Sequence, residues 1–158
     1  MPFTLKGKPL HVSREFVRAW IHATLSVLGY HNKLAPQGLT LVLVWDPPGD
    51  WMGQWSELNG RVDLRADLGI EDMATTILHE LIHACCGPFG GDTEEKCTST
   101  LTARLKPTVA AVADALLLNT YKNAAYFAHT RLSYRATSGD HYDTDEDQPI
   151  GVKDRYRR

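Results

Sequence analysis

Cysteine is scarce in this chain of 158 residues, and both long apolar runs and a large excess of one charge are missing. The three cysteines are an odd number, and Cys85 and Cys86 are adjacent, which argues against a disulfide framework. No apolar run approaches the roughly 18 residues that span a bilayer, and the first residues lack the pattern of a signal peptide. The 17 basic and 19 acidic residues give a formal charge of −2, which argues against a nucleic-acid partner. We therefore expect a cytoplasmic protein that binds neither membranes nor nucleic acid.

Length and composition predict one folded domain. Hydrophobic residues make up 43% of the chain, which is enough for one core, and the length is too short for two ordinary domains. Residues 138–158 are rich in charge and poor in apolar side chains. This composition predicts a flexible tail that follows a domain at residues 1–137.

The first half of the chain predicts a helix, a strand and a hairpin. Apolar residues three and four apart follow Ser13, a good N-cap, and Gly29 is placed to end this amphipathic helix. Residues 39–45 are rich in β-branched side chains and predict a mostly buried strand. Residues 51–57 and 61–67 flank Asn59-Gly60, a sequence typical of a tight hairpin turn, and the second arm alternates so that one face is solvated.

The second half predicts helices. Helical spacing resumes at Glu71 or Asp72 and ends at Gly87, and a further helix is expected from Thr93 to Pro107, where the ring should kink it or begin a new helix. The predicted fold class is α+β: a single domain in which a small mixed or antiparallel sheet packs on one helix, with further helices around it.

The pattern His79-Glu80-Leu81-Ile82-His83 carries the clearest chemical signal, and chance matches to it are rare in a chain with 7 histidines. Two imidazoles four residues apart on a helix can bind one metal ion from the same side, while Leu81 and Ile82 anchor the buried side. Glu80 can take a proton from the attacking water and pass it to the leaving amine. The alternatives are two histidines that are ordinary surface or core residues, or a structural zinc site with Cys85 or Cys86. The position of these cysteines at the end of the helix favours ordinary packing over zinc binding.

A catalytic zinc site needs a third protein ligand, and no histidine follows His83 at a suitable spacing. A chain that turns within residues 87–92 would bring the next helix back beside His83. Glu94 and Glu95 at the start of that helix are therefore both candidates.

The motif resembles that of gluzincins, a branch of the zinc metallopeptidases, and the strand before the helix resembles small phage- and mobile-element-associated zincins. The resemblance covers about residues 39–118 and implies a zincin-like fold that hydrolyses peptide bonds. It implies His79, His83 and Glu95 as zinc ligands, with Glu94 as the rival third ligand, and Glu80 as the general base. It also implies that a peptide or protein substrate pairs with an edge strand, for which Arg61 to Asp67 is the counterpart.

A non-catalytic regulatory or binding protein on a zincin scaffold, with a structural zinc, is the competing hypothesis. The intact Glu80 argues against it, because a structural site has no use for that carboxylate.

Weaker signals concern aromatic residues and the oxyanion. The tryptophans near the hairpin are expected in the core rather than in a pocket wall. The residues considered for stabilising an oxyanion, without a spacing rule to choose among them, are Tyr121, Tyr126, His129, Arg131 and Tyr134.

Overall fold

The computed structural model describes residues 3–29 and 38–134, with side chains as far as residue 122. The predicted tail at residues 138–158 and the domain boundary at 137 lie outside the described residues. The fold is α+β, as predicted. Its elements are β1 (Thr4–Lys6), α1 (Arg14–Val27), β2 (Thr40–Val44), β3 (Gly53–Ser56), β4 (Arg61–Arg65), α2 (Ile70–Cys86), the 3₁₀ turn η2 (Gly91–Thr93) and α3 (Glu94–Tyr134).

The four strands form one mixed sheet in the order β1-β2-β4-β3. β2 pairs in parallel with β1 and with β4, whereas β3 and β4 form the predicted antiparallel hairpin. Gly60 adopts a positive φ of 59° in its turn, a conformation that glycine tolerates. The short strand β1 was not predicted.

The prediction that residues 61–67 form an edge strand is wrong. β4 has a hydrogen-bonded neighbour on each side, β2 and β3, so the sheet ends at β3 and at β1. The physical reason is that the parallel pairing of β2 with β4 joins segments distant in sequence and buries Val62 and Leu64 completely. β3 is the edge strand on the side of the hairpin.

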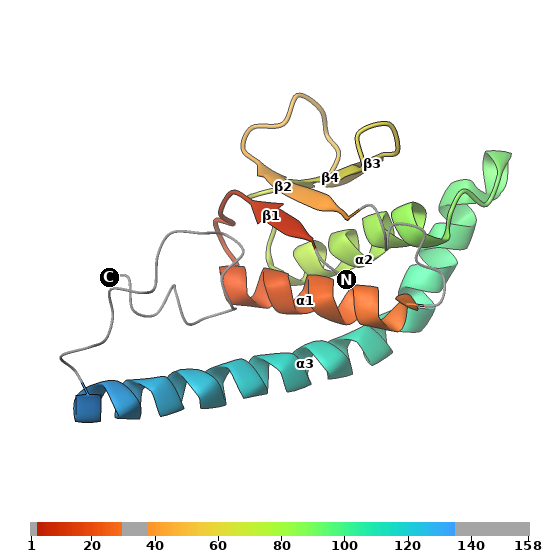
Figure 1. The fold of residues 1–158 in the computed structure, drawn as a ribbon. Coiled ribbons are helices and arrows are strands. Elements are labelled where there is room, and N and C mark those ends of the chain that lie inside the picture. The colour runs from red at the N-terminus through yellow and green to blue at the C-terminus, as the bar shows by residue number, and fades with distance from the viewer. Residues whose placement is uncertain (1–2, 30–37, 135–158) are drawn as a thin grey trace.

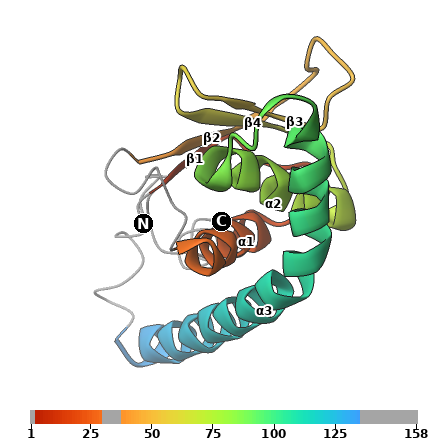
Figure 2. The same cartoon turned by 90° about the vertical axis from the view of Figure 1, so that its right-hand side faces the viewer.

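The helices cover one face of the sheet (Figures 1 and 2). α1 and α2 lie directly beneath it, and α3 contacts both of them. Leu41 and Leu43 of β2 point into the same buried layer as Val62 and Leu64 of β4. The residues between them on both strands are exposed or only partly buried. The predicted hairpin arm with one solvated face is therefore confirmed.

Local signals explain where α1 begins but not where it ends. The Ser13 hydroxyl accepts a hydrogen bond from the backbone N–H of Phe16 at 3.1 Å, as its N-cap role predicts. The expected left-handed cap at Gly29 is wrong. Leu28 is the C-cap, and its N–H continues the helical pattern to the Thr24 carbonyl at 2.9 Å.

The helix that carries the motif, α2, and the helix that follows it, α3, begin close to their predicted positions. α2 begins at Ile70 and ends before Gly87, and α3 begins at Glu94 because Thr93 still belongs to the 3₁₀ turn. α3 contains Pro107 and bends along its length (Figure 1), as expected of a helix that accommodates proline. Among the described residues, no helix combines the length and apolar character needed to cross a membrane.

Candidate metal centre

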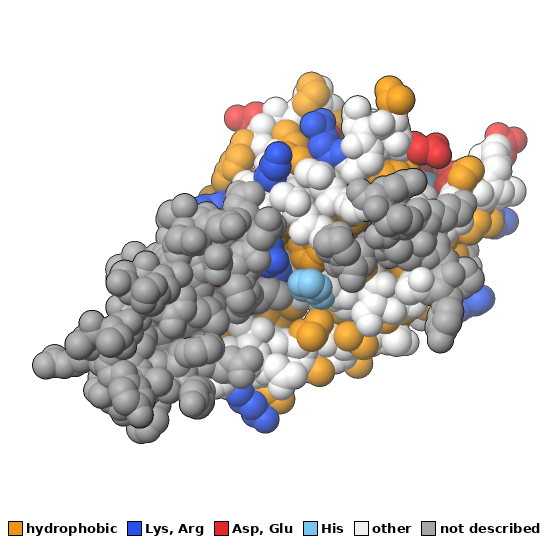
Figure 3. Space-filling model, viewed as in Figure 1, with side chains coloured by type: hydrophobic (Ala, Val, Ile, Leu, Met, Phe, Trp, Pro, Cys, Tyr) orange, Lys and Arg blue, Asp and Glu red, His pale blue; other side chains and the backbone are white. Residues whose placement is uncertain are grey.

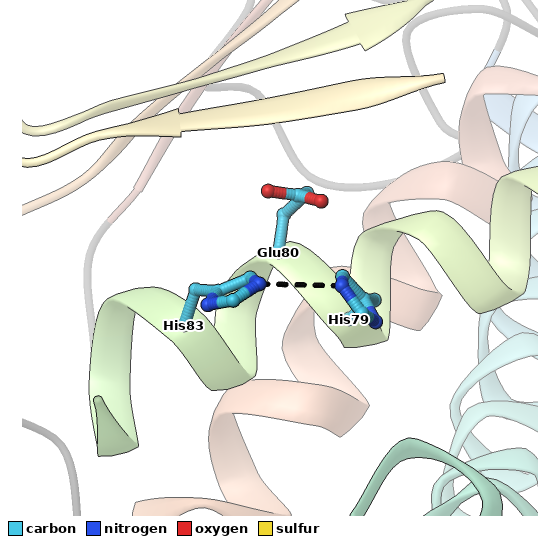
Figure 4. A group of neighbouring side chains, drawn as sticks. All are labelled: His79, Glu80 and His83. Carbon is cyan, nitrogen blue, oxygen red and sulfur yellow. Dashed lines mark hydrogen bonds between the residues drawn. The ribbon is translucent and has the colours of Figure 1, made fainter. Parts of the chain in front are cut away.

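α2 holds the His-Glu-x-x-His pattern with its apolar side buried. Leu81 and Ile82 are completely buried, whereas the side chains of His79, Glu80 and His83 remain partly accessible. In Figure 4 the two imidazoles face each other, and Glu80 points toward the strands. The potential ligand atoms of these three residues lie within 4.8 Å of one another, so the group can hold a metal ion.

Glu95 completes a set of three donors. The Nε2 atoms of His79 and His83 are 3.2 Å apart. Oε1 of Glu95 lies 2.8 Å from Nε2 of His83, and Oε2 lies 3.0 Å from Nε2 of His79. One carboxylate from α3 thus contacts both imidazole nitrogens that face each other on α2.

Glu94 contacts the opposite side of the same imidazole. Its Oε2 lies 2.7 Å from Nδ1 of His83, and its Oε1 accepts a hydrogen bond from the backbone N–H of Phe89. The Phe89 N–H, followed by the His83 ring, lowers the pKa of Glu94, so this carboxylate is ionised at neutral pH. Glu94 therefore orients His83 rather than facing the point where Glu95 and the two Nε2 atoms meet.

The hydrogen-bond roles of His83 favour a cation at that point. Because an ionised Glu94 can only accept, Nδ1 of His83 must donate to it. In a neutral imidazole Nε2 is then an acceptor, yet it faces the Glu95 carboxylate and Nε2 of His79. A proton or a metal ion must lie between Nε2 of His83 and the Glu95 carboxylate, because both are acceptors in that tautomer.

The donor set suits zinc. Two imidazole nitrogens and one carboxylate are typical of a catalytic zinc site with an open fourth position. Ligands at the usual zinc distances stand roughly 3.4 Å apart in a tetrahedron. The observed separations of 2.8 to 3.2 Å need only a small outward movement of the side chains.

Glu80 lies between the two imidazoles and β3. Burial raises the pKa of Glu80, while the neighbouring imidazoles and a hydrogen bond from the backbone N–H of Trp55 oppose the shift. A Cβ atom added to Gly53 would lie 2.5 Å from Cγ2 of Thr76 and 3.0 Å from Cγ of Glu80. Only glycine lets the edge strand approach this carboxylate so closely.

Gly87, just after α2, is a second position where the backbone comes too close to its neighbours for a side chain. A Cβ atom there would lie 2.7 Å from the His83 carbonyl oxygen and 2.9 Å from Oε2 of Glu94. The backbone φ of this residue is −76°, so the requirement for glycine is steric and not conformational. Gly87 leaves room for the carboxylate that contacts Nδ1 of His83.

A cavity of about 820 Å³ opens beside the centre. Its lining comes from residues 38–40, from Trp55 and the β3–β4 turn, from the end of α2 with His83, from residues 87–88, and from Glu94 at the start of α3. The expectation that the tryptophans lie in the core is wrong for Trp45, which is 51% exposed just after β2. Trp55 is half-buried and forms part of the cavity wall.

The cysteines show no role in the centre. Cys85 is completely buried, and burial raises the pKa of its thiol to about 12. Neither Cys85 nor Cys86 belongs to the group of potential ligands found among the described residues. Ordinary packing, the interpretation favoured for Cys85, is confirmed by its burial.

Of the five residues considered for stabilising an oxyanion, only Tyr121 has a described side chain. Tyr121 lies on α3 and is 45% exposed. The side chains of Tyr126, His129, Arg131 and Tyr134 lie outside the described residues.

Sequence reasoning missed several contributors to the site. The sequence pattern offers Glu94 only as a rival ligand. Two successive acids that face two histidines also allow one acid to bind the metal and the other to orient an imidazole. Sequence reasoning also missed Gly53, Gly87 and the cavity residue Glu57, for which the sequence contains no distinct local signal. The sequence matches no protein-family profile, and no curated protein is significantly similar to it.

Proposed function

We propose that this protein is a zinc-dependent metallopeptidase that hydrolyses peptide bonds. The observation that carries the proposal is the meeting of one Glu95 carboxylate with Nε2 of His79 and of His83, at 3.0 and 2.8 Å. His79, His83 and Glu95 would hold the ion. Glu80 lies next to this point without taking part in those contacts, which suits a general base.

A zinc ion held by these residues would act as a Lewis acid that polarises the scissile carbonyl and lowers the pKa of the attacking water. Glu80 would take the proton of that water and deliver it to the leaving amine. Its partial burial beneath β3 limits its contact with bulk water, and the Trp55 N–H fixes its direction. Glu94 would keep His83 in the tautomer whose Nε2 can bind metal.

The substrate pairing proposed from the sequence belongs on β3 instead of β4. β3 is the sheet edge beside α2, and its Gly53 packs against Glu80. An extended peptide that adds to β3 would pass directly over the proposed catalytic residues, because strand addition uses free main-chain groups at a sheet edge.

The test is the Glu80→Gln variant, with zinc content measured beside cleavage of a peptide library. We expect one zinc per chain in both proteins and peptide cleavage by the unmodified chain alone. If neither protein cleaves any peptide and both hold zinc, the enzyme proposal fails. The non-catalytic binding protein with a structural zinc then becomes the better description.

A further inference from the structure

The cavity beside the proposed metal centre lies between two parts of the chain. One wall is the hairpin, with Trp55 of β3 and Glu57 in the turn, and the other is the end of α2, with His83. His83, a proposed metal ligand, and Trp55, whose backbone N–H contacts Glu80, both line the cavity, so it adjoins the place where the scissile bond would be held. A side chain next to that bond can enter it.

The lining combines apolar surface with negative charge. Leu39, Trp55 and Pro88 supply apolar surface, and both charged residues in the lining, Glu57 and Glu94, are acidic. Among the residues that the structure describes, no lysine or arginine lines this cavity. Figure 3 shows acidic side chains beside the β3–β4 turn. The cavity therefore favours a group that is both apolar and cationic.

The two acids differ in availability. Glu94 already accepts from Phe89 and His83. Glu57 is exposed and forms no ion pair with any described residue, whereas Arg61 on the neighbouring strand is paired with Asp63 at 2.9 Å. Glu57 thus remains free to bind a charge brought by a substrate.

We propose that this cavity is a specificity pocket for a lysine or arginine side chain adjacent to the scissile bond. The inference rests on the proposed peptidase function. The aliphatic part of the side chain would pack on Trp55 and Pro88, and the cationic end would reach Glu57. The indole of Trp55 adds a cation–π contact.

Other side chains fit the cavity less well. An acidic side chain would meet two carboxylates of the same charge. A purely apolar side chain would gain the same contacts with the wall but would not pair with Glu57. A small side chain would make few contacts with Trp55 and Pro88 and would not pair with Glu57.

The first test compares cleavage of peptides that differ only at the residues flanking the scissile bond, where they carry lysine, norleucine or glutamate. We expect kcat/KM for lysine to exceed that for norleucine by roughly fivefold, because the pair with Glu57 forms at an exposed position. Glu57→Gln should bring this ratio close to one. Asp114→Asn removes an exposed acid outside the lining and should leave the ratio unchanged. An unchanged ratio in Glu57→Gln overturns the proposal.

A binding measurement separates this inference from the enzyme proposal. The zinc-loaded Glu80→Gln protein is titrated with the lysine and norleucine peptides, and tryptophan fluorescence reports occupancy. Tighter binding of the lysine peptide, reduced by Glu57→Gln and by added salt, supports the pocket even if no peptide is cleaved. Equal binding of the two peptides overturns the pocket, whether or not the unmodified chain is a peptidase.

Discussion

Adjacent glutamates at the start of α3 contact different nitrogen atoms, and this division leads to the first prediction. Glu95→Gln should lose stoichiometric zinc, because its carboxylate faces both Nε2 atoms. Glu94→Gln should keep one zinc per chain with an affinity lower by about tenfold, since only the orientation of His83 is weakened. Elemental analysis and a competition titration with a chelator measure the two effects. Zinc lost from Glu94→Gln and retained by Glu95→Gln would reverse the assignment.

The second prediction at this scale concerns Gly53. Gly53→Ala would place a methyl group 3.0 Å from Cγ of Glu80 and even closer to Thr76, so the carboxylate or the strand must shift. We expect peptidase activity to fall by at least about tenfold while zinc content stays the same. Gly29→Ala is the control, because nothing lies within 4 Å of the added atom. Equal activity of the two variants would show that the close approach has no catalytic role.

The third prediction concerns the thiols. Burial raises the pKa of Cys85 to about 12, so almost none of it is thiolate at pH 8. Alkylation of the folded protein followed by mass spectrometry should modify Cys97, which is partly accessible, well before Cys85. In denaturant both thiols should react. Rapid labelling of Cys85 in the folded protein would contradict its position in the core.

At the scale of elements, α3 both supplies Glu94 and Glu95 and packs against α1 and α2. Val109 is completely buried on this helix, whereas Val112, one turn later, is only partly buried. Val109→Ala should lower the free energy of unfolding by about 2 kcal/mol, through lost apolar contacts and the cavity left behind. The same change at Val112 should cost less, and urea denaturation compares the two. A larger loss at Val112 would contradict the packing of α3.

The hairpin and the parallel pair illustrate how far local patterns predict elements. Asn59-Gly60 marks the turn of the hairpin in the sequence, and the structure confirms the antiparallel pairing of β3 with β4 and the positive φ of Gly60. The parallel pairing of β2 with β4 leaves no local signal, since the two segments are separated by the whole of β3. The identity of the edge strand, and with it the proposed substrate-binding edge, depended on that pairing.

At the scale of the whole molecule, the centre joins two helices that the Gly87–Thr93 segment separates. Zinc that binds only the folded state should stabilise the whole domain, by about 2.7 kcal/mol when its free concentration is a hundredfold above Kd. We expect the thermal midpoint to rise by several degrees with zinc and to fall on chelation. Glu95→Gln should remove this dependence. A thermal midpoint of the unmodified chain that does not change with zinc would contradict a site spanning α2 and α3.

Features that depend only on neighbours along the chain follow from the amino-acid sequence alone. The spacing of His79 and His83 places both on one side of a helix, since residues four apart are neighbours there. Ser13 and Asn59-Gly60 likewise specified their cap and turn through local backbone geometry. These features are the same in any tertiary arrangement that keeps the element.

Which groups meet across different elements depends on how those elements pack. Consecutive residues at a helix start point about 100° apart, so the path of residues 87–93 determines that Glu95 faces the Nε2 atoms and Glu94 faces Nδ1. Glu57 becomes a cavity residue, and Gly53 a neighbour of Glu80, only when the hairpin packs on α2. These contacts join residues far apart in sequence, and their geometry follows from how the elements pack rather than from any local preference.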